Sequence, residues 1–194
     1  MKTNLRHIVK YDPSKHHRKS IRLKGYDYTH PGGYFVTIVT LWRECMFGKI
    51  VDGVMQLNEL GQIIWECWEE IPAHFPNTDV NEFVVMPNHV HGILFIHEGN
   101  GTPICPACVG AQHAAPLRGM KINVKSGSLG AIIRSFKSAV TRRAGRELNS
   151  ANIWQRNYYE HIIRNNADWE RICNYIAANP LNWVEDEENP INIR

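Results

Sequence analysis

The sequence predicts an α+β fold: a ferredoxin-like antiparallel sheet with helices packed on one face. Strand-like apolar stretches come mostly in pairs joined by short turns, and helical stretches with a 3.6-residue apolar period lie between these pairs. Helices that alternate with hairpin-joined strands pack against an antiparallel sheet. The length of 194 residues and the hydrophobic fraction of 43% fit one domain with a substantial core.

The first half of the chain contains most of the predicted strands. Asp52-Gly53 separates two short apolar runs and predicts a tight turn. Asn58 precedes a helical apolar stripe and can cap it, and Pro72 or Pro76 ends that helix. The predicted elements are a strand at 34–41, a hairpin of 47–51 with 54–57, a helix after Asn58, and strands at about 80–86 and 89–96.

The second half begins with a long loop at 97–127, rich in Gly, Pro, Ala and Ser. Ser128 can cap the next helix, whose apolar side includes Leu129 and Val140. An aromatic stretch at 154–163 predicts a strand. A last helix opens at Asn165 or Asn166 and stops at Pro180.

Composition predicts a basic arm at 1–24, a single folded domain at 25–183, to which we assign the candidate catalytic residues below, and an acidic tail at 184–194. No apolar run is long enough to cross a bilayer, and the N-terminus lacks an apolar signal region. Five irregularly placed cysteines do not resemble a secreted disulfide framework. We therefore expect a reduced, cytoplasmic protein.

Positive charge is concentrated in two blocks, although the net charge is only +3. Residues 2–24 hold eight Lys and Arg with one acid, and residues 118–146 hold eight with none. Such blocks favour a localised phosphate-binding surface, and the alternative is a solvated helix face with a flexible arm. The candidate DNA contacts lie off the apolar stripe of the helix after Ser128: Arg134, Lys137, Arg142 and Arg143.

The pair His89 and His91 is the strongest functional signal. Residues i and i+2 of a strand point to the same face, so both imidazoles stand on one side of an otherwise apolar sheet. Burying them costs free energy unless they find partners, and one divalent ion would use both. The alternative is two hydrogen-bonded structural histidines.

The last helix carries polar groups that its apolar pattern does not need. At 100° per residue, Asp168, Tyr175 and Asn179 fall on one line, which we expect to face a sheet edge. If that edge holds the two histidines, Asn179 could supply a third metal ligand and Tyr175 a nucleophile. The alternative is that Tyr175 packs at the core edge and Asn179 merely ends the helix.

The segment Met86-Pro87-Asn88-His89-Val90-His91-Gly92-Ile93 resembles the HUH motif of single-tyrosine transposases. Further blocks resemble the REP-associated tyrosine transposases within that superfamily: residues 25–28 with 34–37, 127–137, 154–164 and 175–180. The resemblance covers roughly residues 20–183, and the blocks occur in the family's order.

This resemblance implies a metal-dependent transposase that cleaves and rejoins hairpin-bearing single-stranded DNA. Tyr175 would attack a phosphodiester and leave a 5′-phosphotyrosine with a free 3′-hydroxyl. His89, His91 and Asn179 would hold Mg²⁺ or Mn²⁺. The resemblance is compatible with a homodimer or a monomer.

Several alternatives remain open. The chain could be a non-catalytic DNA-binding protein that keeps the fold, or a metal-dependent RNA- or nucleotide-processing enzyme that does not need Tyr175. Tyr158 and Tyr159 are the other candidate nucleophiles, with Tyr159 as the runner-up and packing or base stacking as their alternative role, and His161 could orient a phosphate. Residues in two further groups could bind zinc or stack on bases: Cys105 and Cys108 with His113 for zinc, and Tyr26, Tyr28 and Trp42 for bases.

Overall fold

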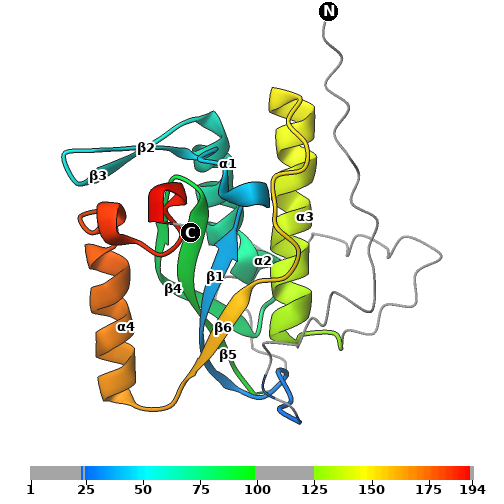
Figure 1. The fold of residues 1–194 in the computed structure, drawn as a ribbon. Helices are drawn as coiled ribbons and strands as arrows, with labels where there is room; N and C mark the ends of the chain where they lie inside the picture. Colours follow the sequence, from blue (N-terminus) through cyan, green and yellow to red (C-terminus); the bar gives the residue numbers. More distant parts are fainter. Residues whose placement is uncertain (1–22, 24, 99–124, 193–194) are drawn as a thin grey trace, which may run out of the picture.

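The structure is a computed structural model that describes residues 23, 25–98 and 125–192 (Figure 1). Most of the predicted basic arm and of the 97–127 loop, with Cys105, Cys108 and His113, lies outside the described residues. Within the described part of the chain, no helix combines the length and apolar character needed to cross a membrane.

The centre of the fold is a four-stranded sheet with the order β4-β5-β1-β6. Each neighbouring pair of strands is antiparallel. This order places the first and third strands of the sheet in its middle, which is the ferredoxin-like arrangement, so the predicted fold class is confirmed. The strands are β1 at Gly32–Val39, β4 at Thr78–Val85, β5 at His89–Ile96 and β6 at Tyr159–Ile163.

A separate hairpin pairs β2 (Gly48–Val51) with β3 (Val54–Leu57). Its two turn residues have positive φ angles, 50° at Asp52 and 75° at Gly53. A two-residue turn with both φ angles positive matches the twist of the flanking strands, and Asp-Gly tolerates it. The predicted hairpin is therefore confirmed.

The helices begin where the sequence predicts caps. Asn58 Oδ1 accepts the N–H of Gly61, and Asn165 Oδ1 accepts the N–H of Asp168. Pro72 does not end α1 directly; it lies in the first turn of α2, where its missing N–H costs nothing. The helices are α1 at Glu59–Glu69, α2 at Ile71–His74, α3 at Leu129–Leu148 and α4 at Asn166–Ala178, with short 3₁₀ turns η1 at Leu41–Arg43, η3 at Trp183–Glu185 and η4 at Pro190–Asn192.

One face of the sheet packs against α1 and α3. Even-numbered residues of the central strands, such as Val36 and Val90, join Trp68 and Phe136 in the main apolar cluster. Gly92 makes room for the indole, because a Cβ there would lie 2.3 Å from Trp68. We call this the dry face.

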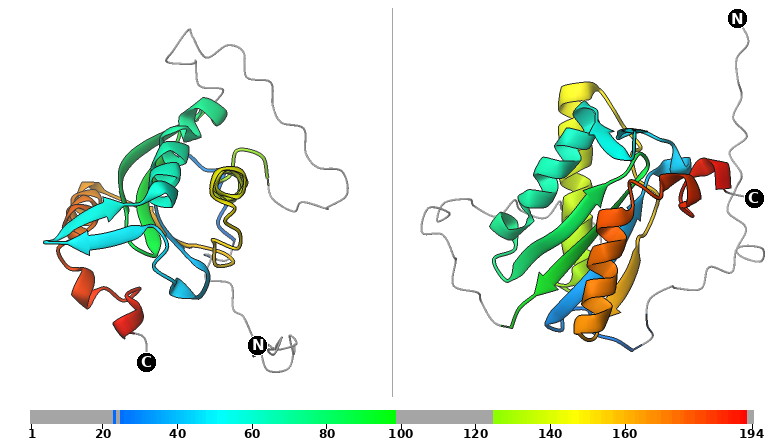
Figure 2. Two further views of the ribbon diagram at one scale, coloured as in Figure 1. Left: turned by 90° about the horizontal axis from the view of Figure 1, so that it is seen from above. Right: turned by 90° about the vertical axis from the view of Figure 1, so that its left-hand side faces the viewer.

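The other face is covered by α4, which corrects the expectation that all helices lie on one face. Ile172 and Ile176 of α4 pack on Ile93 and Phe35, two odd-numbered strand residues. Figure 2 shows α4 on the opposite side of the sheet from α1 and α3. The cause is that the central strands are apolar on both faces, so a second layer is needed to keep water from this one.

The aromatic stretch at 154–163 is only partly a strand. Trp154 forms an isolated bridge with Thr40, and regular pairing with β1 starts at Tyr159. Asn157, with a φ of 73°, interrupts the extended backbone between them. A residue in the left-handed region breaks strand geometry, and hydrophobic pattern alone does not reveal it.

Candidate functional site

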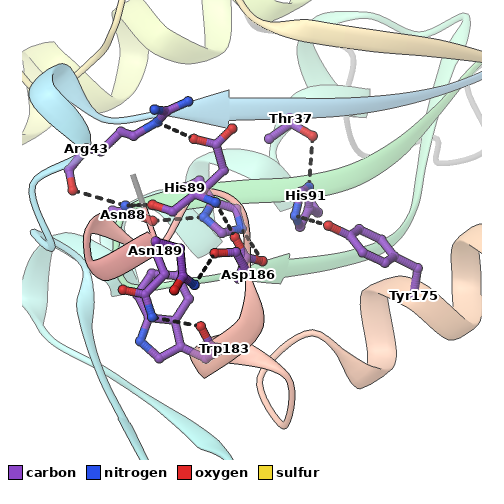
Figure 3. Close-up of polar contacts among 11 residues, drawn as sticks. Thr37, Arg43, Asn88, His89, His91, Tyr175, Trp183, Asp186 and Asn189 are labelled. Carbon is purple, nitrogen blue, oxygen red and sulfur yellow. Dashed lines mark hydrogen bonds and ion pairs between the residues drawn. The ribbon is translucent and has the colours of Figure 1, made fainter. Parts of the chain in front are cut away.

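Strand β5 places His89 and His91 on the face that α4 covers (Figure 3). Their rings are 4.4 Å apart between centroids, and 0% and 3% of the two residues is exposed. His89 pairs with Val39 and His91 with Thr37, so both lie on a central strand. The expectation of a sheet-edge position is wrong, since β5 has neighbours on both sides.

The side chain of Asn88 fixes the proton of His89. Its Nδ2 donates to the carbonyl oxygens of Arg43 (3.0 Å) and Glu188 (2.7 Å), so its Oδ1 must face His89 Nδ1 at 2.9 Å. Because that oxygen only accepts, Nδ1 carries the proton and Nε2 presents a lone pair. Burial lowers the pKa of His89 to about 3, although contact with Asn179 opposes this, so the ring is neutral at pH 7.

His91 is held from both sides. Its Nδ1 lies 2.9 Å from Thr37 Oγ1, and its Nε2 lies 3.2 Å from the hydroxyl of Tyr175. Burial, followed by the neighbouring His89, keeps its pKa well below the usual value. A neutral ring with an oriented Nδ1 is the form that can bind a metal through Nε2.

Helix α4 brings two of its three aligned polar residues to the histidines. The Tyr175 hydroxyl contacts His91, while the ring remains 46% exposed. Burial, with a smaller contribution from the charge of Asp186, raises the pKa of Tyr175. Asn179 is 3% exposed at the end of α4, and its Oδ1 has no hydrogen-bond partner within residues 25–98 and 125–192.

Asp168, the third residue on that line, lies elsewhere. Its carboxylate accepts from His161 Nε2 at 2.7 Å and from Arg171 at 2.5 Å. These contacts, His161 first, lower the pKa of Asp168 to about 2. Asp168 therefore organises the start of α4 and the neighbouring β6, more than one helical turn before Tyr175.

Asp186 joins the histidines, although sequence reasoning assigned it to the acidic tail. One ligand atom from each of His89, His91 and Asp186 lies within 4.8 Å of the others. Asp186 Oδ2 is 3.9 Å from His89 Nε2. The available signal was the run Glu185-Asp186-Glu187-Glu188, but a charged run near a chain end is typical of solvated tails.

The segment that carries Asp186 is tied to the loop after β1. The Arg43 guanidinium pairs with Glu188 at 2.6 Å, and the Glu188 carbonyl accepts from Asn88. Asn189 Nδ2 donates to the Trp183 carbonyl and closes the segment on itself. Residues 183–192 therefore lie against the start of β5 (Figure 3).

These donor atoms fit a divalent cation. Among the described residues, His89 Nε2 and Asn179 Oδ1 are buried without a hydrogen-bond partner, which is costly for both groups. Both are lone-pair donors, and Asp186 adds a negative charge beside them. Two imidazole nitrogens with amide and carboxylate oxygens suit Mn²⁺ and also admit Mg²⁺ or Zn²⁺.

The alternative residues of this region are separated from the histidines. Tyr158 is buried in the dry-face cluster. Tyr159 is 45% exposed. It pairs with Thr37 on the far side of β1 from β5, so Thr37 separates it from His91. Of the predicted base-stacking aromatics, Tyr28 is buried and Trp42 is 77% exposed.

The four predicted DNA contacts differ in their surroundings on α3. Lys137 Nζ donates to the carbonyls of Gln155 and Asn157, both at 2.7 Å. Arg143 pairs with Glu66 and Glu147. Arg134 and Arg142 are exposed. All four lie on the helix that covers the dry face, across the sheet from Tyr175.

Comparison with known proteins gives close and distant relatives. No family model matches the chain. An uncharacterized protein of Haemophilus influenzae is 44% identical over 180 residues, which is 92% of this chain and 97% of that protein. The chain belongs to the same family as this protein.

The distant relatives are transposases. The REP-associated tyrosine transposase of Escherichia coli K12 is 27% identical over 109 residues, so the match spans 55% of this chain and about half, 48%, of that protein. A solved REP-associated tyrosine transposase bound to a REP hairpin has a TM-score of 0.55 at 21% identity, over 81% of this chain and 72% of that one. The chain shares its fold and is a distant homologue of such transposases.

Proposed function

We propose that this chain, like its distant transposase homologues, processes DNA, and that it is a metal-dependent single-tyrosine nuclease and strand transferase acting on hairpin-bearing single strands. The observation that carries the proposal is the contact between Tyr175 and His91, at 3.2 Å, beside buried lone pairs that lack partners. The Nε2 atom of His91 would bind the proposed ion, so the phenol would exchange this contact for a place beside the ion, which is the position that a nucleophile needs.

The proposed ion, Mn²⁺ or Mg²⁺, is held by His89, His91 and Asn179, with Asp186 as an additional ligand. Asn88 and Thr37 orient the two imidazoles through their Nδ1 atoms. When bound, the ion would supply Lewis-acid polarisation of a non-bridging phosphate oxygen. All of these groups and Tyr175 come from one chain, so one copy can assemble the whole site.

In the proposed reaction the Tyr175 oxygen attacks the phosphorus and loses its proton. The bond between phosphorus and the 3′-oxygen breaks, and that oxygen takes up a proton. The products are a 5′-phosphotyrosine and a free 3′-hydroxyl, and the reverse reaction joins strands without external energy. Without the ion, burial raises the pKa of Tyr175, so the free phenol is protonated at neutral pH.

Arg134 and Arg142 are the proposed contacts to the hairpin backbone, because they are exposed. Lys137 and Arg143 retain a smaller proposed part, since their donors are already used within the chain. DNA that reaches both α3 and Tyr175 must pass around the sheet, which a folded hairpin with a single-stranded extension could do.

Covalent trapping tests the proposal. Labelled hairpin DNA with a single-stranded extension is incubated with the protein and Mn²⁺, and adducts are separated after denaturation. We expect an adduct with the wild type and with Tyr159→Phe, and none with Tyr175→Phe. An adduct that survives in Tyr175→Phe and disappears in Tyr159→Phe moves the nucleophile to Tyr159. Tight hairpin binding without any adduct supports a non-catalytic DNA-binding protein.

A further inference from the structure

Trp42 combines exposure with an unusual backbone. Its side chain is 77% exposed, and its φ angle is 59°. Arg43 follows with a φ angle of 56°, so two consecutive residues with full side chains adopt the left-handed region. This conformation is unfavourable for such residues and persists only where the surrounding structure imposes it.

The surrounding structure does impose it. The Leu41 N–H donates to Ile153 at 2.8 Å, and the Thr40 N–H donates to Asn88 at 2.8 Å. The Arg43 carbonyl accepts from Asn88 Nδ2, and the Arg43 guanidinium pairs with Glu188. The backbone is thus fixed on both sides of Trp42, and the indole is held outward by a rigid frame.

The frame lies beside the proposed ion site. Strand β1 ends at Val39, which pairs with His89, and Trp42 follows three residues later. The side chain that anchors Arg43 belongs to Glu188, two residues after Asp186. Asn88, which holds the Arg43 carbonyl, also orients His89. The same groups that place the metal ligands therefore place the indole.

We propose that Trp42 is a stacking platform for an unpaired base of the single-stranded extension, next to the phosphate that Tyr175 attacks. This inference rests on the proposed function and adds the position of the single-stranded DNA beside the site. Bases stack on aromatic side chains irrespective of sequence, and a rigidly presented indole loses little entropy on binding. The partner is a nucleobase because the platform adjoins a phosphodiester-binding centre.

Trp65 offers a matched comparison. It is also exposed, at 41%, but its ring packs on Phe83 with centroids 4.4 Å apart, and its backbone is helical. Its exposure is that of an amphipathic helix edge, with no strain to explain. Trp65→Leu therefore controls for the loss of an exposed indole elsewhere on the molecule.

Binding is measured in the full chain carrying Tyr175→Phe, with Mn²⁺, so that cleavage does not interfere. Two DNAs are compared: a hairpin with a single-stranded extension that carries 2-aminopurine, and the blunt hairpin alone. We expect Trp42→Leu to weaken binding of the extended DNA about 10-fold and to leave the blunt hairpin unchanged. Trp42→Phe, which can still stack, and Trp65→Leu should stay within about 3-fold of the parent.

Fluorescence identifies stacking directly. The 2-aminopurine signal should be quenched on binding to the parent and to Trp42→Phe, and should recover in Trp42→Leu. Unchanged binding and quenching in Trp42→Leu would overturn the inference. So would an equal loss of affinity for the extended and the blunt DNA, or an altered oligomeric state of Trp42→Leu in place of weaker DNA binding. The proposed catalysis fails separately, if the wild type binds and stacks the extension but forms no adduct.

Discussion

The two faces of the central strands use one backbone for opposite purposes. On the dry face, Val36 and Val90 pack under α1 and α3 in a continuous apolar cluster. On the α4 face, Thr37 and His91, their direct neighbours in sequence, form a buried polar chain that ends at Tyr175. The difference shows that the strand period of two lets stability and chemistry occupy alternate residues of the same strands.

The faces also differ in what holds their covering layers. The dry face packs against α1 and α3 through the large apolar cluster, whereas α4 packs on the sheet through a small apolar cluster around Ile93. The polar part of that face is closed by residues 183–192 through Asn88 and Arg43. Stability should therefore depend mainly on the dry face, and ion affinity on the other.

The largest effect on stability is expected from Trp68→Ala on the dry face. Trp68 is fully buried against Gly92 and Phe136, and its removal leaves a cavity. We expect a loss of about 3–5 kcal/mol in the free energy of unfolding, measured with urea. The folded fraction should bind Mn²⁺ with unchanged affinity by calorimetry; a large loss of affinity would show that the faces are coupled.

Asp186→Asn should act on the other face. The substitution keeps an oxygen but removes the negative charge beside His89 Nε2. We expect Mn²⁺ affinity to fall on the order of 10- to 100-fold, with little change in the urea midpoint. Glu187→Gln is the control, because it removes a neighbouring charge outside the ligand cluster. Equal affinity in Asp186→Asn and the wild type would remove Asp186 from the ion site.

A reciprocal pair of substitutions separates the faces at adjacent residues. Thr37→Val removes the hydroxyl that orients His91 and should weaken Mn²⁺ binding about 10-fold. Val36→Thr buries a hydroxyl in the apolar cluster and should cost about 1–3 kcal/mol of stability without changing ion affinity. If Thr37→Val and Val36→Thr lose Mn²⁺ affinity equally, alternate residues of β1 do not separate stability from ion binding.

The smallest effect concerns Lys137 of α3, whose ammonium is partly buried against residues 155–157. Burial lowers its pKa from 10.5 to about 8. Because the folded pKa lies below the unfolded one, the unfolded chain binds the proton more tightly between these values. The free energy of unfolding should therefore rise between pH 8 and 10.5, by about 1–2 kcal/mol relative to Lys137→Met. Parallel pH profiles for the two proteins would contradict this assignment.

Local signals predicted most of the fold. The caps at Asn58, Ser128 and Asn165, the Asp52-Gly53 turn and the strand alternation around His91 are all properties of a few adjacent residues. The face of the sheet that α4 covers could not be predicted from local signals. Both faces of the central strands are apolar, and sequence spacing does not state which helix covers which face.

The same distinction applies to the site. Spacing along one strand and one helix was sufficient to bring Tyr175 and Asn179 into consideration with the histidines. Asp186 was missed because its proximity depends on tertiary contacts, such as the pair of Arg43 with Glu188, 145 residues apart in sequence. Trp42 showed no signal of strain, since a left-handed tryptophan is dictated by its frame and not by its own preferences.

The side chain of Asn88 joins the imidazole of its neighbour His89 to two distant stretches, the loop at Arg43 and the carbonyl of Glu188. Asn88 can reach Arg43 and His89 early in synthesis, whereas Glu188 is made 100 residues after Asn88. The strands that carry both imidazoles and their partners, β1 and β5, are therefore made well before Glu188. Completion of the proposed ion site therefore requires residues 183–192 to dock on the start of β5.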